Sequence, residues 1–373
     1  EVMFENKVSG VLVIDSNGRQ EGIITKHDLQ FASYKNSRVY EVMTPREKLI
    51  TAHLGVTPKE ARDLMFSHRI EKLPLVDEDF RLAGLITAKD LRKSEFYPNA
   101  NVDEHGRLRV GAAIGATGDF LERAQELVRV GVDVIVIDSS HGHSHNVRNA
   151  LVQLKKLPGI VDVVAGNIAT GKAARFLMDA GADGLRVGIG SGSTCITRIV
   201  TGCGVPQITA NISVYEEIGD EIPFCSDGGV RFSGDIVKAL ASGASSVMSG
   251  FIFAATEETP GETFPHKGQL YKRYRGMGSE SVIKEGGERY GAKAVPEGID
   301  GAVLHRGPAA RQIGLILGGL RQGMGYVGCR TIDELRHKAV FMKLSGAGVA
   351  ESHVHDILIT NEAPNYQVSP REE

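Results

Sequence analysis

The chain has 373 residues, of which 42% are hydrophobic and 24% charged, so it has room for one large domain or two ordinary ones. Its net charge of -3 argues against nucleic-acid or membrane-surface partners, which favour a basic face, and no apolar run reaches the roughly 18 residues of a membrane span. The four cysteines contain no C-x-x-C pair, which argues against a disulfide framework and predicts a cytoplasmic protein with reduced thiols.

An internal repeat occupies the N-terminal part of the chain. Val11–Leu29 and Leu73–Leu91 each read as an apolar strand, an acidic turn, a second strand and a helix start, at an offset of about 62 residues. Both copies contain a T-x-x-D pattern, at Thr25 and Asp28 and at Thr87 and Asp90. This pattern is typical of a helix N-cap, and equally of a contact for the ribose and phosphate of a nucleotide. The residues leave both interpretations open.

After the repeat, short β-type runs alternate with helix-period segments, which predicts a parallel sheet with helical crossovers. The expected strands are Leu108–Ile114, Val132–Asp138, Val161–Gly166, Leu185–Gly190, Ile222–Ser226 and Ser245–Phe251. The expected helices include Phe120–Val130, Lys172–Ala180 and Gly234–Ala241. Polar or Gly-rich loops follow most runs, as on the active-site face of a (β/α)8 barrel. Six units are visible where a closed barrel needs eight, so an open doubly wound sheet is the alternative.

The most informative segment is Val187–Gln207, VGIGSGSTCITRIVTGCGVPQ. A strand ends in closely spaced glycines, with Cys195 on the same turn and Thr197 two residues later. Such glycines let the backbone wrap a small ligand, and their carbonyl groups can ligate a cation. A phosphate-binding loop with an incidental cysteine is the plainer interpretation.

Other polar residues are less specific by themselves. Asp138 and Asn167 stand at the ends of successive expected strands. They could be structural caps or could line a cleft. Arg289 and Tyr290 lie in the polar, Gly-rich stretch Lys284–Lys293, which reads as a surface loop. Three alternating histidines are more typical of a solvated loop than of a metal site: His141, His143 and His145.

The cysteine segment contains G-x-G-S-x-C-x-T followed by R-x-V-T-G-x-G-V-P-Q, which resembles the catalytic loop of inosine-5'-monophosphate (IMP) dehydrogenases, of the bacterial type. The resemblance continues in order along the chain. It covers Gly106–Ala113, Ile137–Ser144, Ala165–Thr170, Ser226–Ser245, Tyr274–Ser279, Val295–Ile299, Ser345–Ile357 and Glu362–Tyr366. The N-terminal repeat resembles a CBS-domain pair, with the connecting VMTP segment at Val42–Pro45.

The resemblance implies an α/β protein with a (β/α)8 TIM barrel into which the CBS pair is inserted. We expect the CBS pair over residues 1–95, with its first module incomplete at the N-terminus. Residues 96–373 would form the catalytic barrel, with the active-site flap and C-terminal segment. The first two barrel strands then fall outside the sequence.

The implied reaction is the NAD-dependent oxidation of IMP to xanthosine 5'-monophosphate, a step of guanine nucleotide synthesis. Cys195 would be the nucleophile, with Thr197, Arg289 and Tyr290 as the other catalytic residues. The implied substrate-binding residues are Ser193, Asp227, Gly228, Gly229, Gly250, Tyr274, Gly276, Met277, Gly278 and Glu297. The implied NAD-binding residues are Asp138, Ser139, Ser140, Asn167, Arg186, Gly188 and Gly190.

The resemblance also implies a potassium ion and a homotetramer. The ion would be held by carbonyl groups of Gly190, Gly192 and Cys195, completed by residues of a neighbouring subunit. These are Glu351, Ser352 and His353. Adenine or guanine nucleotides would bind the CBS pair as regulators, while neither nucleic acid nor a membrane is an expected partner.

Two other functions stay open. GMP reductases resemble this family but lack the flap pair Arg289-Tyr290, which would activate water, so the pair favours a dehydrogenase. The third possibility is an inert, nucleotide-sensing CBS protein. The sequence predicts low activity for these 373 residues alone, because two absent strands would leave open sheet edges beside the cleft.

Two departures from the family pattern bear on the site. The family has a phosphate-binding serine directly after Gly250, where this chain has Phe251, and Ser249 would face the other side of a strand. The flap segment between Tyr290 and Val295 is shorter than in bacterial relatives. We therefore expect weaker phosphate binding and impaired flap closure.

Overall fold

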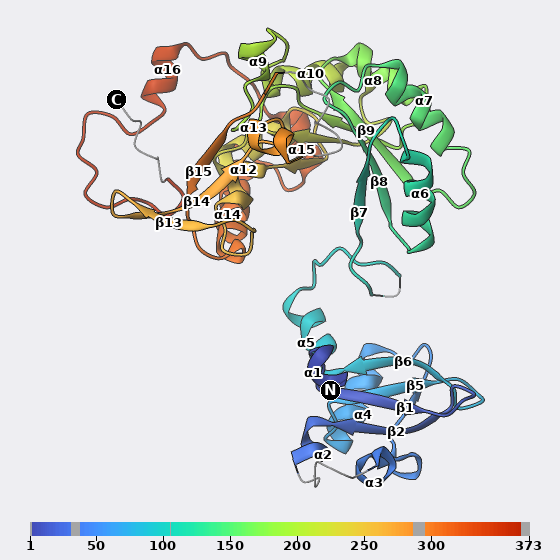
Figure 1. The fold of residues 1–373 in the computed structure, drawn as a ribbon. Helices are drawn as coiled ribbons and strands as arrows, with labels where there is room; N and C mark the ends of the chain where they lie inside the picture. The colour runs from blue at the N-terminus through green and yellow to red at the C-terminus, as the bar shows by residue number, and fades with distance from the viewer. Residues whose placement is uncertain (1, 31–37, 105, 286–294, 367–373) are drawn as a thin grey trace. The chain divides into compact units, whose positions relative to one another are not determined.

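The computed structural model describes residues 2–30, 38–104, 106–285 and 295–366 (Figure 1). The chain divides into two compact units, Glu1–Leu108 and Arg109–Glu373, called unit 1 and unit 2. The domain boundary proposed at residues 95–96 falls inside helix α5 (Ala88–Phe96). No helix among the described residues is long and apolar enough to cross a membrane.

Unit 1 contains two three-stranded sheets, with strand orders β1-β2-β3 and β4-β5-β6. Its strands are β1 (Gly10–Ile14), β2 (Gln20–Thr25), β3 (Thr44–Pro45), β4 (Ala52–His53), β5 (Lys72–Val76) and β6 (Leu82–Thr87). Its helices are α1 (Val2–Glu5), α2 (Lys26–Gln30), α3 (Val39–Val42), the 3-10 helix η1 (Arg46–Lys48), α4 (Pro58–His68) and α5. Met65 and Leu73 lie in a small buried core between α4 and the second sheet.

Strand register confirms the internal repeat. Gly10 pairs with Thr25 in the first hairpin, and Lys72 pairs with Thr87 in the second. The hairpin turns exchange reciprocal hydrogen bonds, from Gln20 N to the Phe80 carbonyl (3.0 Å) and from Leu82 N to the Gly18 carbonyl (2.9 Å). Reciprocal contacts of this kind arise when two copies of one motif are related by a local twofold axis.

The T-x-x-D patterns form the predicted helix caps. Asp90 N donates to the Thr87 hydroxyl (3.2 Å), and Thr87 N donates to the Asp90 carboxylate (3.0 Å). In the first copy, the Asp28 carboxylate accepts from both the N–H and the hydroxyl of Thr25, each at 2.7 Å. Capping satisfies N–H groups that a helix start leaves without partners. The nucleotide contact stays a prediction.

Unit 2 is built on a six-stranded parallel sheet in the order β12-β11-β10-β9-β8-β7. The strands are β7 (Gly111–Ile114), β8 (Val134–Asp138), β9 (Asp162–Ile168), β10 (Gly184–Val187), β11 (Phe224–Asp227) and β12 (Ser246–Met248). Their order follows the chain without reversal, whereas a doubly wound sheet reverses at a switch point. The six predicted strand–helix units are thus confirmed, and the doubly wound alternative is excluded.

Helices cover one face of this sheet (Figure 1). They are α6 (Phe120–Arg129), α7 (His145–Leu154), α8 (Gly171–Met178), α10 (Gln207–Ile218) and α11 (Ser233–Ala241). Ile135 and Ile137 of β8 are fully buried against Leu151 and other side chains of these helices. Successive strand residues point to opposite faces, so Asp138 faces away from this core. The same alternation determines which face of the sheet the other polar side chains at the strand ends occupy.

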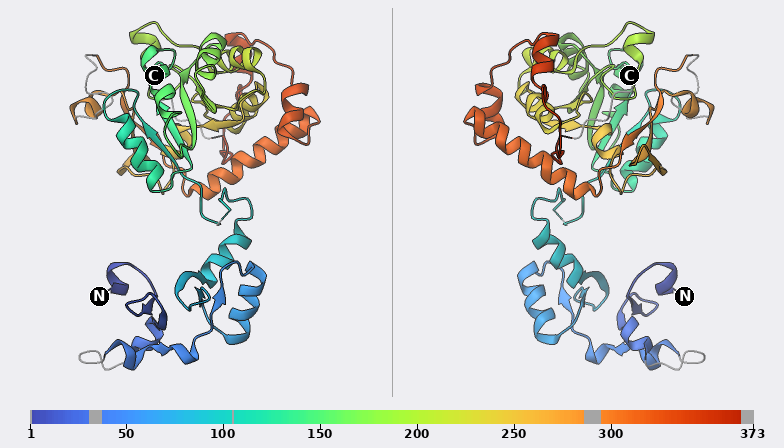
Figure 2. Two further views of the ribbon diagram at one scale, coloured as in Figure 1. Left: turned by 90° about the vertical axis from the view of Figure 1, so that its right-hand side faces the viewer. Right: turned by 90° about the vertical axis from the view of Figure 1, so that its left-hand side faces the viewer.

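The rest of unit 2 is a small antiparallel sheet with further helices. The sheet has the order β13-β14-β15, from β13 (Thr263–His266), β14 (Gln269–Arg275) and β15 (Asp300–Leu304). The helices are α9 (Thr197–Val200), α12 (Gly250–Ala254), α13 (Glu280–Lys284), α14 (Ala309–Val327), α15 (Ile332–Lys338) and α16 (Gly346–Glu351). Figure 2 shows α14 as the long orange helix, and it packs against α11.

The strand expected at Ser245–Phe251 is corrected by the structure. β12 ends at Met248, and α12 begins at Gly250. The Ser249 hydroxyl accepts from Ile252 N (3.3 Å) and caps this helix, while it donates to the Val230 carbonyl (3.4 Å). The expectation that Ser249 lies on a strand and faces its other side is therefore wrong, because Ser249 is a buried helix cap.

Candidate active site

A cavity of about 260 Å³ opens at the carboxyl ends of β8, β9 and β10. Parallel α/β sheets bind their ligands at this edge, where the loops after the strands converge. The predicted residues that line it are Asp138, Ser139, Ser140, Asn167, Arg186, Gly188, Gly190, Gly192, Cys195, Thr197, Gly276, Met277, Gly278 and Glu297. Segments far apart in the sequence thus meet where the motifs predicted a common site.

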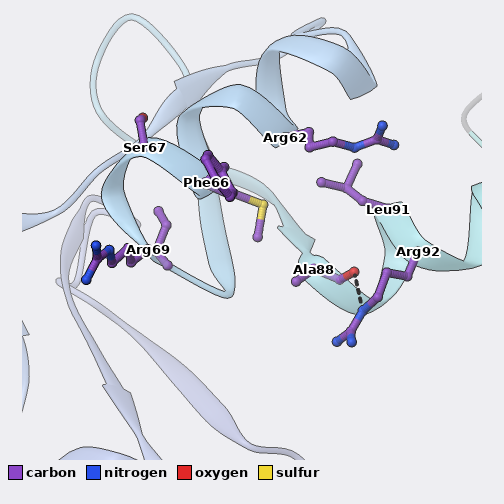
Figure 3. Close-up of a pocket in the computed structure, with 9 residues that line it drawn as sticks. Arg62, Phe66, Ser67, Arg69, Ala88, Leu91 and Arg92 are labelled. Carbon is purple, nitrogen blue, oxygen red and sulfur yellow. Dashed lines mark hydrogen bonds between the residues drawn. The ribbon is translucent and has the colours of Figure 1, made fainter.

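Two larger cavities lie within unit 1. One of about 570 Å³ lies between α4 and α5, with three arginines around an apolar floor (Figure 3). The Arg69 guanidinium points away from those of Arg62 and Arg92, and the lining residues include no thiol, histidine or carboxylate. No histidine or carboxylate in this lining could activate the Ser67 hydroxyl as a general base, so the cavity lacks the groups of a catalytic site. The other, of about 490 Å³, contains Thr25 and Asp28.

Positive φ angles and close backbone contacts shape the loop that carries Cys195. Gly188 and Gly190 have φ of +152° and +76°, values that side-chain-bearing residues rarely adopt. The Cys195 N–H donates to the Gly192 carbonyl (3.1 Å), which turns the chain back on itself. Ile196 N donates to the Glu297 carbonyl (2.9 Å), so the loop pairs with the segment just before β15.

The Cys195 thiol begins a short chain of hydrogen bonds. Its Sγ lies 3.1 Å from the Thr197 hydroxyl oxygen and donates to it. The Thr197 hydroxyl donates in turn to a carboxylate oxygen of Glu297 at 2.8 Å. All three side chains line the cavity, and Cys195 is half-buried. A thiol placed this way can release its proton through Thr197 toward Glu297.

Arg186 joins two carboxylates at the base of the cavity. Its guanidinium lies 3.1 Å from Asp138 and 2.7 Å from Asp227, and Asn167 Nδ2 donates to the same Asp227 oxygen (2.9 Å). Burial alone would lower the pKa of Arg186, but the two carboxylates outweigh it and raise that pKa. Arg186 is therefore a fixed positive charge that holds Asp138 and Asp227 in place.

A second group of predicted residues meets where α12 approaches β14. A Cβ atom on Gly250 would stand 2.5 Å from the Tyr274 hydroxyl oxygen, so only glycine allows this approach. Burial raises the pKa of Tyr274, a hydrogen bond with Thr194 opposes this, and the Asp227 charge adds to it. The phenol therefore stays protonated and able to donate. Phe251 and Tyr274 both pack against a small apolar cluster of Ala254, Ala255 and Val303.

The structure does not bring every predicted residue to the cavity. Asp227, Gly228, Gly229, Gly250 and Tyr274 lie beside it, not in its lining. Ser193 is exposed on the Cys195 loop, and Arg289 and Tyr290 fall outside the described residues. The predicted potassium ligands Glu351, Ser352 and His353 lie at the end of α16, and His353 hydrogen-bonds the Tyr366 hydroxyl (2.8 Å).

Several residues of the site were missed from the sequence. Ser191 ties the Cys195 loop to the next strand, since its hydroxyl donates to the Asp227 carbonyl (2.8 Å) and its carbonyl accepts from Gly229 N (2.9 Å). Thr194 and Gly298 line the cavity, as does Ile189. Ser191 stands between two predicted glycines, so the Gly-rich motif could have indicated it. Gly298 stands inside the resemblance segment Val295–Ile299, but its pairing with Cys195 arises only in the folded chain.

The fold and the cavity define an α/β protein with barrel-type strand order and a thiol-bearing Gly-rich loop at the strand ends. Residues 13–355 match the IMP dehydrogenase / GMP reductase domain. The inosine-5'-monophosphate dehydrogenase of Aquifex aeolicus is 49% identical over 377 residues, covering 99% of this chain and 77% of that protein. The Bacillus subtilis enzyme of the same name is 47% identical over 378 residues, with the same two coverages.

Solved structures agree. GMP reductase of Trypanosoma brucei, a cysteine-to-alanine variant in complex with guanosine 5'-monophosphate, gives a TM-score of 0.87 at 40% identity, over 94% of this chain and 74% of that one. The same reductase with guanosine 5'-triphosphate gives 0.74 at 36% identity, over 91% and 71%. The chain therefore belongs to the IMP dehydrogenase / GMP reductase family, and the predicted resemblance is confirmed.

The thiols of the site should differ in reactivity. Burial raises the pKa of Cys225, which a hydrogen bond with Ser246 partly offsets, so at neutral pH this thiol is protonated and unreactive. We expect an alkylating reagent to modify exposed Cys203 first and Cys225 slowly, with Cys225 speeding up as pH rises toward its raised pKa. IMP should protect Cys195 and leave Cys203 unprotected. Peptide mass spectrometry measures all three; equal rates at Cys225 and Cys203 would contradict the assignment.

Proposed function

We propose that this chain is an IMP dehydrogenase, which oxidises IMP to xanthosine 5'-monophosphate with NAD as the hydride acceptor. The observation that carries the proposal is the hydrogen-bonded series Cys195, Thr197 and Glu297 inside the strand-end cavity. The 47–49% identity to named IMP dehydrogenases over 99% of the chain supports it.

The thiol starts the reaction. Cys195, having passed its proton through Thr197 toward Glu297, adds its sulfur to carbon 2 of the hypoxanthine ring. The hydride on carbon 2 then leaves with its electron pair, which restores the double bond and gives a thioimidate on Cys195. Water adds to that carbon, the carbon–sulfur bond breaks, and xanthosine monophosphate is released. Splitting one difficult substitution into two steps is how covalent catalysis lowers a barrier.

The nicotinamide supplies a two-electron acceptor for that hydride when NAD is bound. The residues present fit such a group, because the buried Asn167 Oδ1 has no hydrogen-bond partner and the cavity has a polar rim. Asp138, held by Arg186, would bind ribose hydroxyls of the nicotinamide half. The remaining cofactor residues are Ser139, Ser140, Gly188 and Gly190.

The substrate would be held at both ends. Asp227 would bind the ribose hydroxyls of IMP, and the Tyr274 hydroxyl, kept protonated by its raised pKa, would donate to the phosphate. The backbone amide of Gly250, at the start of α12, would complete the phosphate site. Gly228 and Gly229, whose amides donate to the carbonyls of Met248 and Ser191, would shape the turn beside it. Ser193, Gly276, Met277 and Gly278 would approach the base, whose N–H would reach Glu297.

A potassium ion and a homotetramer belong to the same proposal. Among the described residues, no cluster of three or more His, Cys, Asp or Glu side chains is placed to hold a metal. Carbonyl oxygens suit a hard cation, and Gly190, Gly192 and Cys195 would supply them. A neighbouring subunit would supply Glu351, Ser352 and His353. The tetramer would be located in the cytoplasm.

Unit 1 would bind regulatory nucleotides as a CBS pair. The cavity of about 490 Å³ is lined by Thr25 and by cations that include Lys48, Arg69 and Lys72, together with the carboxylates of Asp28 and Glu71. Such cations suit phosphate groups, and a carboxylate suits ribose hydroxyls. The related reductase was solved with guanosine 5'-triphosphate. Adenine and guanine nucleotides are the expected ligands.

Replacing the nucleophile tests the proposal. Cys195→Ala should lower single-turnover NADH formation by more than about a thousandfold, because no thioimidate can form. IMP binding, measured by calorimetry, should persist. The matched control is Cys203→Ala, which removes an exposed thiol of the same loop region. Activity of Cys195→Ala within about tenfold of the unmodified chain would contradict the mechanism.

The direction of the reaction is tested at Arg289. Arg289→Ala should slow hydrolysis far more than hydride transfer, since Arg289 and Tyr290 would activate the water. A burst of NADH followed by a slow steady state is the expected time course. Oxidation of NADPH with GMP and release of ammonia would instead establish a reductase. Nucleotide binding without either reaction would favour the inert sensor.

The regulatory site is tested by two matched cap variants. Asp28→Ala and Asp90→Ala each remove a carboxylate that caps a helix, but only Asp28 lines the cavity of about 490 Å³. Asp28→Ala should weaken ATP or GTP binding by about tenfold, and Asp90→Ala should not. Calorimetry measures both. An equal loss of nucleotide affinity in the two variants would show that the T-x-x-D pattern serves only in helix capping.

A further inference from the structure

Lys272 is the most deeply buried cationic residue of β14. Only 2% of it is exposed, and its Nζ donates to the carbonyl oxygens of Thr256 (2.6 Å) and Glu257 (3.1 Å). A lysine amino group is rarely buried, because its lost contacts with water must be replaced by hydrogen bonds. Here the replacements are the backbone carbonyls just beyond the end of α12.

Tyr274 lies on the same face of β14, two residues further on. Its hydroxyl approaches Gly250, the first residue of α12. β14 thus contacts the first residue of α12 through Tyr274, and the backbone just after the last residue of α12 through Lys272.

The carbonyls that Lys272 contacts are held firmly. The Thr256 hydroxyl donates to the Phe253 carbonyl (2.8 Å), and the Thr259 hydroxyl donates to the same oxygen (2.6 Å). Glu257 N donates to the Gly307 carbonyl (3.0 Å), beyond the end of β15. Lys272 therefore joins β14 to the backbone that follows α12, and its loss would remove a direct link between these two elements.

We propose that Lys272 is a positioning residue for the substrate phosphate. It sets the distance between the Gly250 amide and the Tyr274 hydroxyl, without lining the cavity itself. This inference rests on the proposed function, in which these two groups bind the phosphate of IMP. The Cys195 loop is held by other contacts, to Glu297 and to the Asp227 turn, so Lys272 should act on binding and not on the chemical step.

The test compares a nucleotide with its nucleoside. In the full chain, Lys272→Met should weaken IMP binding by about tenfold, which corresponds to about 1.4 kcal/mol, and change inosine binding by less than about threefold. The single-turnover rate of NADH formation at saturating IMP should stay within about threefold. Arg273→Met is the matched control, since Arg273 is an exposed cation on the opposite face of β14.

A double-mutant cycle separates positioning from general destabilisation. If Lys272 acts through the Tyr274 contact, Lys272→Met should weaken IMP binding much less in a Tyr274→Phe background. If Lys272→Met does not fold, Lys272→Arg is the second variant, because it keeps hydrogen-bond donors on a longer side chain. Lys272→Arg should also weaken the binding of IMP more than that of inosine, but by a smaller factor. Equal losses for IMP and inosine, or additive effects in the cycle, would overturn the inference. If the unmodified chain binds no IMP, the proposed function fails instead.

Discussion

The active site depends on how closely the loops after β10 and β11 approach each other. A Cβ atom on Gly188 would collide with the Asp227 carbonyl, and one on Gly228 would stand 2.5 Å from the Ser191 hydroxyl. Ser191 then joins the two loops through its side chain and its carbonyl. This contact leaves no room for side chains at the two glycines. It also ties the Cys195 loop to the turn that follows Asp227.

The close approach of these strand ends also brings two carboxylates together, which would repel each other without a cation between them. Asp138 and Asp227 come from different strands, yet both contact the guanidinium of Arg186. The ion pairs are largely shielded from water, since about a fifth of each side chain is exposed. Breaking one partner of such a buried pair is costly, so the triad is rigid. A rigid triad can present carboxylate oxygens to ribose hydroxyls without reorganising.

Sequence reasoning located the parts of the site that lie on strand ends. Asp138 and Asn167 were found because parallel strands end in line, and Cys195 because its glycine spacing is distinctive. Phe251 was placed on a strand, since a run of apolar residues does not reveal where Ser249 begins a helix. Lys272 could not be found, because a lysine between polar neighbours in β14 reads as exposed. Its burial depends on α12, which is distant in the sequence.

The two halves of the proposed substrate site share one supporting segment. Residues 269–275 form β14, which contacts α12 through Lys272 and Tyr274 and so supports the phosphate end. β14 also pairs with β15, and the chain just before β15 pairs with the Cys195 loop, where Glu297 accepts from Thr197. Because β14 and β15 are hydrogen-bonded side by side, one small sheet connects the proposed phosphate site to the Cys195 loop. A ligand that contacts both ends therefore binds two segments that the antiparallel sheet already connects, which reduces the ordering cost of placing carbon 2 against the sulfur.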